Sequence, residues 1–351
     1  MQTTTVIDYV LAHNADAVRD YANPDNALWR RQYRARCPTE IATLECMDGR
    51  LNMPIMCDVP VGIIHQFRNI GGKFDLGWSY FGLLVNRWVE TAVKRGHDAL
   101  VIVTYHYSKG NTHRGCAGWG YDTNAARNDA FAIKAQFERV FGNEHRIVYP
   151  IIIGIETDED VFIVHGENGE TLELASITET GMASLRATLR RLFPDMREQV
   201  VLDLLPLLEG NVKHVANVRA HNRTPVEHEH MEQVMGIGRG FDWLHIHNKA
   251  LIIGPYEHNL REPVEKAAGI LLSNLEAGRI PKDDGVVVMT SGTYKDENGP
   301  ERLLAIEKAL SYARFAKKTI EAAVPALVPH VSYLAGYVDV NTREYRRVPF
   351  A

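Results

Sequence analysis

The chain has 351 residues, of which 45% are hydrophobic and 24% are charged, a composition typical of folded globular proteins and not of disordered chains. At about 150 residues per domain, this length predicts roughly two compact units. The 39 basic and 44 acidic residues give a net charge of −5, so no overall basic field is available to bind nucleic acid. No apolar run is long enough to span a bilayer, and the first residues lack the pattern of a secretory signal. We therefore expect a cytoplasmic protein with neither nucleic acid nor membrane as a partner.

All four cysteines lie in the first third of the chain, at Cys37, Cys46, Cys57 and Cys116. They are too few, in too long a chain, for the disulfide framework of a small secreted protein. Reduced thiols are either inert packing residues, the interpretation we favour for Cys37 and Cys57, or metal ligands and nucleophiles. Any thiolate chemistry is therefore confined to residues before 117.

The first third of the chain is predicted to contain both helices and strands. The pattern places helices over 6–21, 27–36 and 79–95, and strands over 41–45, 62–67 and 99–104. The first two helices form an N-terminal helical arm. The last strand is a continuous apolar run, which is typical of a strand buried on both faces of a parallel sheet. A strand, a helix and a strand in this order indicate an α/β fold.

Chemically reactive side chains follow the ends of two predicted strands. Cys46 comes directly after the strand 41–45, and the loop after the strand 99–104 contains His106, His113 and Cys116. Sites in open α/β sheets form outside the carboxyl ends of the strands. Two thiols and one imidazole brought together there suit a zinc ion with a fourth position open to water.

Asp48 and Arg50 extend this pattern along the chain. Asp48 lies two residues after Cys46 in an extended segment, so the two side chains are expected to point to the same side. Arg50 lies two residues further on and can hold a carboxylate with two hydrogen bonds. The sequence therefore predicts a charged pair beside the candidate metal ligands.

These motifs resemble the β-class carbonic anhydrases over roughly residues 40–120: Cys46-x-Asp48-x-Arg50, then Arg68-Asn69-x-Gly71-Gly72, then a strand-terminal histidine followed by Gly115-Cys116. The usual family spacing of His-x-x-Cys is met by His113, whereas His106 has the usual position at the strand end. The long insert between His106 and Cys116 is similar to that of the carboxysomal shell carbonic anhydrases. This similarity favours His106 over His113 as the third zinc ligand.

The second half of the chain repeats the order of elements found in the first half. Between the halves we expect a strand pair over 151–171 and helices over 183–208; the second half then has strands over 232–236, 242–248 and 285–290 and helices over 263–276 and 300–321. No cysteine follows Cys116, so this copy cannot hold the same metal. We therefore expect a mostly parallel β-carbonic-anhydrase-like sheet in duplicate: a helical arm (1–40), a zinc-binding catalytic domain (41–225) and a degenerate copy (226–351).

The resemblance implies a lyase, carbonate dehydratase, which hydrates carbon dioxide reversibly to bicarbonate with hydroxide bound to zinc. Zinc is the implied cofactor, held by Cys46, His106 and Cys116, and it lowers the pKa of bound water toward about 7. Asp48, aimed by Arg50, is the implied acceptor of the hydroxide's hydrogen bond. The resemblance also implies a small-molecule substrate, carbon dioxide or bicarbonate, and a homodimer. The carboxysomal family carries a further N-terminal segment of which this chain has almost none, so we expect the cytoplasm rather than the carboxysome.

Two other functions could use the same zinc ligands. One is a hydrolase of carbon disulfide or carbonyl sulfide, which an assay of each gas would separate. The other is a non-catalytic zinc scaffold, although a closed structural site would use a fourth protein ligand and would have no need of Asp48 and Arg50. Histidines outside the motif leave two smaller alternatives open: one histidine of the run 227–230 reaching the metal site, and a second metal pair at His245 and His247.

Overall fold

The computed structural model describes residues 5–142, 147–177, 179–221, 229–246 and 248–350, and these form two compact units. We call one the six-stranded unit; it comprises Leu28–Cys46 and Leu51–His228. We call the other the five-stranded unit; it comprises Met1–Ala27, Met47–Arg50 and Glu229–Ala351. The short segment Met47–Arg50 therefore packs with the second half of the chain, although it follows directly on a strand of the six-stranded unit.

The sheet of the six-stranded unit is mostly parallel, with strand order β2-β1-β3-β4-β5-β6. Its strands are β1 (Glu40–Cys46), β2 (Ile64–Asn69), β3 (Ala99–Tyr107), β4 (Val148–Glu156), β5 (Val161–His165) and β6 (Thr171–Glu173). The strands β1 to β4 pair in parallel, and β5 and β6 add an antiparallel edge. Every residue of β3 from 99 to 106 is buried, as its continuous apolar run predicts. The α/β fold class is confirmed.

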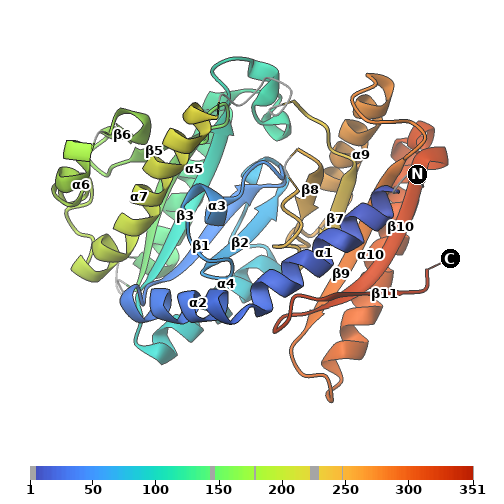
Figure 1. Ribbon diagram of the computed structural model, residues 1–351, viewed down its shortest axis with the longest axis horizontal. Helices are drawn as coiled ribbons and strands as arrows, with labels where there is room; N and C mark the ends of the chain where they lie inside the picture. Colours follow the sequence, from blue (N-terminus) through green and yellow to red (C-terminus); the bar gives the residue numbers. More distant parts are fainter. Residues whose placement is uncertain (1–4, 143–146, 178, 222–228, 247, 351) are drawn as a thin grey trace. The chain divides into compact units, whose positions relative to one another are not determined.

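Helices cover both faces of this sheet. They are α2 (Pro24–Arg36), which begins in the other unit, α3 (Met53–Met56), α4 (Ser79–Arg95), α5 (Thr123–Phe137), α6 (Glu179–Leu192) and α7 (Glu198–Ala220). In Figure 1, α7 crosses in front of the sheet while α5 lies behind it. The approach of α7 to the chain after α3 requires a glycine, because a Cβ atom on Gly210 would lie 1.8 Å from the carbonyl oxygen of Cys57.

The sheet of the five-stranded unit has the strand order β11-β10-β9-β7-β8. Its strands are β7 (Val234–Gly238), β8 (Ala250–Ile253), β9 (Val286–Tyr294), β10 (Val331–Asp339) and β11 (Tyr345–Val348). In chain order these strands take the same places as β1 to β5 of the other sheet, with four parallel strands and one antiparallel edge strand. One topology is therefore present twice, in agreement with the predicted duplication.

Three longer helices pack on this second sheet: α1 (Val6–Ala22), α9 (Arg261–Glu276) and α10 (Glu301–Ala323). Figure 1 shows α1 on one face of the sheet and α10 on the other. Val6 and Val10 of α1 are buried in one core cluster with Trp243 and Tyr345. Asn14, 4% exposed, joins α1 to the chain at the start of β11. Its Oδ1 accepts from the Tyr345 N–H at 2.9 Å, and its Nδ2 donates to the Arg343 carbonyl at 3.1 Å.

One prediction of an element was wrong. The strand expected over 242–248 is a turn among its described residues, and the pairing strand β8 begins only at Ala250. Apolar residues of this irregular segment, including Trp243, are buried in the core. The pattern of apolar residues that predicted a strand therefore reflects core packing. The helices expected over 183–208 are confirmed: they are α6 and α7, and the first ends before Pro194 because proline cannot continue it.

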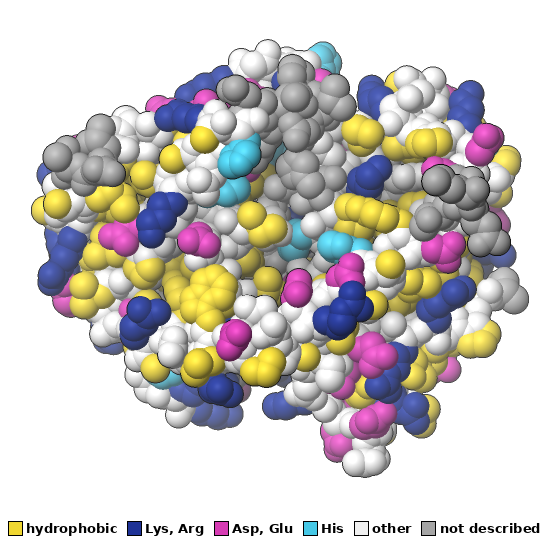
Figure 2. Space-filling model, in the orientation of Figure 1, with side chains coloured by type: hydrophobic (Ala, Val, Ile, Leu, Met, Phe, Trp, Pro, Cys, Tyr) yellow, Lys and Arg dark blue, Asp and Glu magenta, His cyan; other side chains and the backbone are white. Residues whose placement is uncertain are grey.

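Charged side chains of both signs are interspersed on the face of the molecule in Figure 2. Neither sign gathers into one large patch there among the residues described, as expected for a chain with a net charge of −5. Within the described ranges, no helix combines the length and the apolar character needed to cross a membrane.

Asn14→Ala should destabilise the five-stranded unit, because it removes the partners of the buried Tyr345 N–H and Arg343 carbonyl. We expect the free energy of unfolding, measured by urea titration, to fall by about 2–3 kcal/mol. Asn26→Ala is the matched control, since its side chain makes an exposed hydrogen bond to Asp20. A loss for Asn14→Ala as small as the control's would show that α1 is not fixed to this sheet.

Candidate metal centre

Two candidate ligands come from neighbouring parallel strands of the six-stranded unit. Cys46 is the last residue of β1, and His106 is the last but one of β3. The two strands pair directly, with Leu44 opposite Val103, so their carboxyl ends lie at the same edge of the sheet. Both side chains are buried, Cys46 at 5% and His106 at 2% exposure. The pairing of two strands thus brings a thiol and an imidazole together.

Cys116, the third candidate, is held in place by the short helix η3 (Ala117–Trp119) that follows it. Its carbonyl accepts hydrogen bonds from the backbone N–H groups of Trp119 and Tyr121, at 3.1 and 2.9 Å. The Trp119 indole in turn donates to the Gly71 carbonyl at 2.8 Å. Gly71 has a φ of +64°, and a Cβ there would lie 2.9 Å from the indole nitrogen. The paired glycines of the sequence motif therefore allow the segment after Cys116 to pack closely on the sheet edge.

The three side chains form a compact ligand group. One ligand atom from each of Cys46, His106 and Cys116 lies within 4.8 Å of the others, and the two sulfur atoms are 3.8 Å apart. Two sulfur ligands bound at about 2.3 Å to a tetrahedral ion lie about 3.8 Å from each other. The separation of the thiols therefore fits a shared zinc ion.

His106 supplies a second sign that a metal belongs here. Both ring nitrogens are buried, and neither has a hydrogen-bond partner among the described residues. A buried polar atom without a partner is costly and uncommon in a native fold, and coordination of one ring nitrogen to a metal would relieve that cost. The donor set of two thiols and one imidazole, with no fourth protein ligand in the group found among the described residues, leaves a position for water or substrate.

The other sequence candidates lie outside this group. His113 is exposed in the short helix η2 (Thr112–Arg114), and its ring packs edge-on against Tyr121 at 4.9 Å. Cys57 is fully buried, and burial raises the pKa of its thiol well above the usual value. Burial also raises the pKa of the half-buried Cys37. Both of these cysteines are therefore thiols at neutral pH.

A buried ion pair that the sequence analysis missed supports the end of β1. Glu45, which has no exposed surface, pairs with Arg68 at 2.8 Å. The Arg68 guanidinium also donates to the carbonyls of Cys46 and Leu51, the two residues at which the chain leaves the six-stranded unit and returns to it. An acidic residue inside an otherwise apolar buried strand was the available sequence signal, because such a charge needs a partner.

Asp48 and Arg50 form a closed, buried pair, each 4% exposed. The Arg50 Nη2 donates to Asp48 Oδ2 at 2.6 Å, and its Nε donates to Oδ1 at 3.0 Å. Their segment pairs with the edge strand β8, where the Gly49 N–H donates to the Ala250 carbonyl at 2.9 Å. A Cβ on Gly49 would lie 2.3 Å from that oxygen, so the residue between Asp48 and Arg50 has to be glycine. By its packing the pair belongs to the five-stranded unit.

His230 continues this network within the five-stranded unit. Its Nε2 lies 3.4 Å from the Arg50 Nη2, and its Nδ1 lies 2.6 Å from a carboxylate oxygen of Glu232. Asn274 donates to the other carboxylate oxygen of Glu232 at 3.0 Å. Burial lowers the pKa of His230, whereas the charge and hydrogen bond of the Glu232 carboxylate and the charge of Asp48 raise it, and the net pKa lies above its ordinary value of 6.5. Arg50 thus contacts a titratable imidazole as well as the Asp48 carboxylate.

Two smaller alternatives from the sequence fall partly outside the described residues. Residues 227 and 228 of the histidine run are not described, and neither is His247, so the structure does not address a second metal pair with His245.

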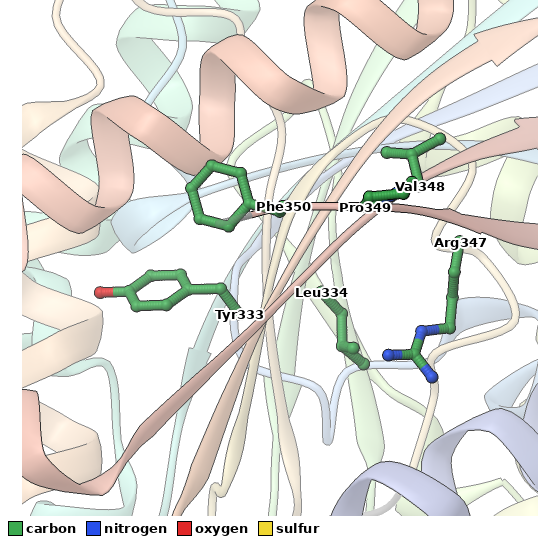
Figure 3. Close-up of a pocket in the computed structure, with 6 residues that line it drawn as sticks. All are labelled: Tyr333, Leu334, Arg347, Val348, Pro349 and Phe350. Atoms are coloured by element: carbon green, nitrogen blue, oxygen red, sulfur yellow. The ribbon is translucent and has the colours of Figure 1, made fainter.

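An open pocket of about 360 Å³ lies beside β10 (Figure 3) and is lined by Tyr333, Leu334, Arg347, Val348, Pro349 and Phe350. That lining has no thiol, imidazole or carboxylate, so it offers no metal ligands.

Part of the chain matches one known protein family. Residues 38–182 match the family described as "Carboxysome Shell Carbonic Anhydrase, catalytic domain". No match to the chain was found among curated proteins.

Three solved structures are similar to the chain. The beta-carbonic anhydrase CcaA is 10% identical, with a TM-score of 0.35 and coverage of 47% of this chain and 92% of its own. One of two tetrameric beta-carbonic anhydrases from the filamentous ascomycete Sordaria macrospora is 14% identical, with a TM-score of 0.30 and coverage of 48% and 96%. A carbonic anhydrase from Streptococcus mutans is 17% identical, with a TM-score of 0.25 and coverage of 42% and 95%. Since every TM-score is below 0.5, these likenesses support no conclusion by themselves.

The raised pKa of His230 gives a testable pH dependence. A histidine whose pKa is higher in the folded than in the unfolded chain stabilises the fold fully below its ordinary pKa of 6.5, and this contribution is lost as the pH rises through the folded value. Glu232→Gln removes the main raising group, so we expect NMR titration to find a lower pKa for His230 in this variant. The exposed substitution Glu276→Gln is the control. An unchanged His230 pKa in Glu232→Gln would contradict the pairing.

Proposed function

Because residues 38–182 match the catalytic domain of the carboxysome shell carbonic anhydrase family, we propose that this chain is a zinc-dependent carbonic anhydrase, a lyase, which converts carbon dioxide and water reversibly to bicarbonate and a proton. The observation that carries the proposal is the convergence of Cys46, His106 and Cys116 within 4.8 Å. These residues come from two strand ends and one long loop, and they supply the ligand set that suits a catalytic zinc.

Zinc bound by this group would supply Lewis acidity, which lowers the pKa of a coordinated water to about 7. The protein's own contribution begins with the rigid sheet. Cys46 and His106 are fixed by strand pairing and not by flexible loops, which is the arrangement that holds ligand geometry best. Burial of all three side chains excludes bulk water from the protein side of the site.

Asp48 is the proposed acceptor that orients the attacking oxygen, and Arg50 is its positioning partner. Arg50 donates to both carboxylate oxygens, but each oxygen has a second lone pair with which to accept a further hydrogen bond. The proposal rests here on sequence position and on the pair itself: Asp48 follows the ligand Cys46 by two residues.

Two finer expectations from the sequence belong to this proposal and stay predictions. One is that two chains associate as a homodimer. The other is that the enzyme works in the cytoplasm.

Zinc content and carbon dioxide hydration measured on one purified sample test the proposal. We expect one zinc ion per chain and stopped-flow hydration that a zinc chelator abolishes. A zinc-loaded protein that hydrolyses carbon disulfide or carbonyl sulfide but leaves carbon dioxide unchanged would replace the proposed substrate. A zinc-loaded protein inert toward all three gases would make the site a structural one.

The ligand assignment predicts opposite results for the two histidines of the loop. His106→Ala should lose both zinc and activity, as should Cys46→Ala and Cys116→Ala, because three protein ligands are the minimum for a catalytic site. His113→Ala is the matched control and should keep one zinc per chain, since His113 is exposed and packs on Tyr121. Zinc loss in His113→Ala with retention in His106→Ala would reverse the assignment.

The pair Asp48 and Arg50 should matter for rate and not for metal content. Asp48→Ala should keep zinc but lose on the order of 10²-fold in kcat, the scale of a positioned acid or base group. Arg50→Ala should lose about as much, because it frees the carboxylate that it holds. Arg95→Ala, which breaks an ion pair with Glu40 at the surface, should leave the rate unchanged. Normal kcat in either pair variant would show that the two residues have only a structural role.

A further inference from the structure

An irregular segment separates the candidate ligands His106 and Cys116 along the chain. Nine residues lie between His106 and Cys116, and among them only Tyr107 belongs to a strand. We call residues 108–116 the ligand loop. Its own hydrogen bonds are short-range: the Asn111 N–H donates to Ser108 Oγ at 3.0 Å, and the Gly115 N–H donates to the Thr112 carbonyl at 2.9 Å. Such bonds shape the loop but do not fix it to the sheet.

Asp158, in the turn after β4, joins the ligand loop to the sheet. Its Oδ1 accepts from the Ser108 hydroxyl at 2.7 Å, and its Oδ2 accepts from the Gly110 N–H at 2.6 Å. Arg114, near the far end of the loop, lies 3.9 Å from the same carboxylate. One side chain therefore contacts the loop at its beginning and near its end.

Glu156, the last residue of β4, adds a second contact beside the first. It is 2% exposed and stands opposite Tyr107 in the sheet. Its Oε1 accepts from the Lys109 N–H at 3.1 Å and also from the Asp158 N–H at 3.1 Å, so it braces both the loop and the turn that carries Asp158. Burial raises the pKa of Glu156 to about 7, although the backbone N–H groups of Lys109 and Asp158 lower it. Both oxygens can accept hydrogen bonds in either protonation state.

These contacts bear on the metal because Cys116 is the only ligand that no strand holds. A ligand carried on a loop keeps its geometry only if neighbouring groups restrain the loop, and the loss of such outer partners typically weakens metal binding about 10- to 100-fold. Hydrogen bonds to a carboxylate are among the stronger restraints available. All of the contacts lie within the six-stranded unit.

We propose that Asp158, braced by Glu156, is a positioning residue that holds the ligand loop so that the Cys116 thiol meets Cys46 and His106. This inference rests on the proposed zinc site and adds to it a part that the sequence motif does not contain. It also gives the long insert between His106 and Cys116 a structural requirement: an insert of this length needs an anchor of its own.

The test compares zinc affinity by competition with a chromophoric chelator. Asp158→Ala should raise the dissociation constant for zinc about 10- to 100-fold, with an altered d–d absorption spectrum when cobalt replaces zinc. Glu159→Gln is the matched control: it is the next carboxylate in the same turn, but its side chain pairs with Arg219 at 2.7 Å. An Asp158→Ala protein with the control's zinc affinity and cobalt spectrum would overturn the inference.

Ser108→Ala removes the hydrogen bond to Asp158 from the loop side, and it replaces Asp158→Ala in the test if that variant does not fold. It should also weaken zinc binding, and the double variant should bind no more weakly than the worse single variant, since the two residues share one hydrogen bond. Fully additive losses would contradict a shared anchor. We expect the zinc-free Ser108→Ala and Glu159→Gln proteins to have equal melting temperatures. Weaker zinc binding by Ser108→Ala would then result from a misplaced loop and not from general destabilisation. If the unaltered chain bound no zinc, the proposed function would fail, whereas equal affinities in all variants would refute the anchor alone.

Discussion

The parallel pairing of β1 with β3 is the constraint on which the candidate metal centre depends. Parallel strands end at the same edge of a sheet, so a residue at the end of one meets a residue at the end of its neighbour. Cys46 and His106 occupy those positions. Because the core on both sides of the sheet fixes the strands, two of the three ligands are placed without any specialised loop. Only Cys116 needs further support, which η3 provides on one side and the acidic turn after β4 on the other.

The second sheet keeps the topology of the first but not its candidate metal ligands. The second sheet repeats the strand order of the first, but β7 ends at Gly238 whereas β1 ends at Cys46. The last but one residue of β9 is Thr293, whereas that of β3 is His106. The second copy has therefore lost the ligands and kept the fold. The segment with Asp48 and Arg50 packs with this second copy through β8.

Much of this arrangement could be predicted because the relevant signals are local. The apolar run at 99–104 predicted a buried strand, and reactive residues after two strand ends predicted a site. The failed strand at 242–248 shows the limit of such reasoning. Trp243 and its neighbours are apolar because they fill the core beneath α1, and burial of an irregular segment can imitate the alternation of a strand.

The supporting contacts could not be predicted, since each joins residues far apart in the chain. Arg68 pairs with Glu45 on the neighbouring strand, and Asp158 meets Ser108 fifty residues away. A single sequence shows these residues only as isolated charges or hydroxyl groups. Their partners depend on strand register and loop path, which the pattern of one chain does not specify.

X-ray absorption spectroscopy at the zinc edge can test the proposed ligand set, because it identifies and counts the atoms around the metal. In the zinc-loaded protein we expect two sulfur ligands at about 2.3 Å, with one imidazole nitrogen and one further light atom at about 2.0 Å. A shell of four sulfur atoms, or a shell with no sulfur, would contradict the site formed by Cys46, His106 and Cys116.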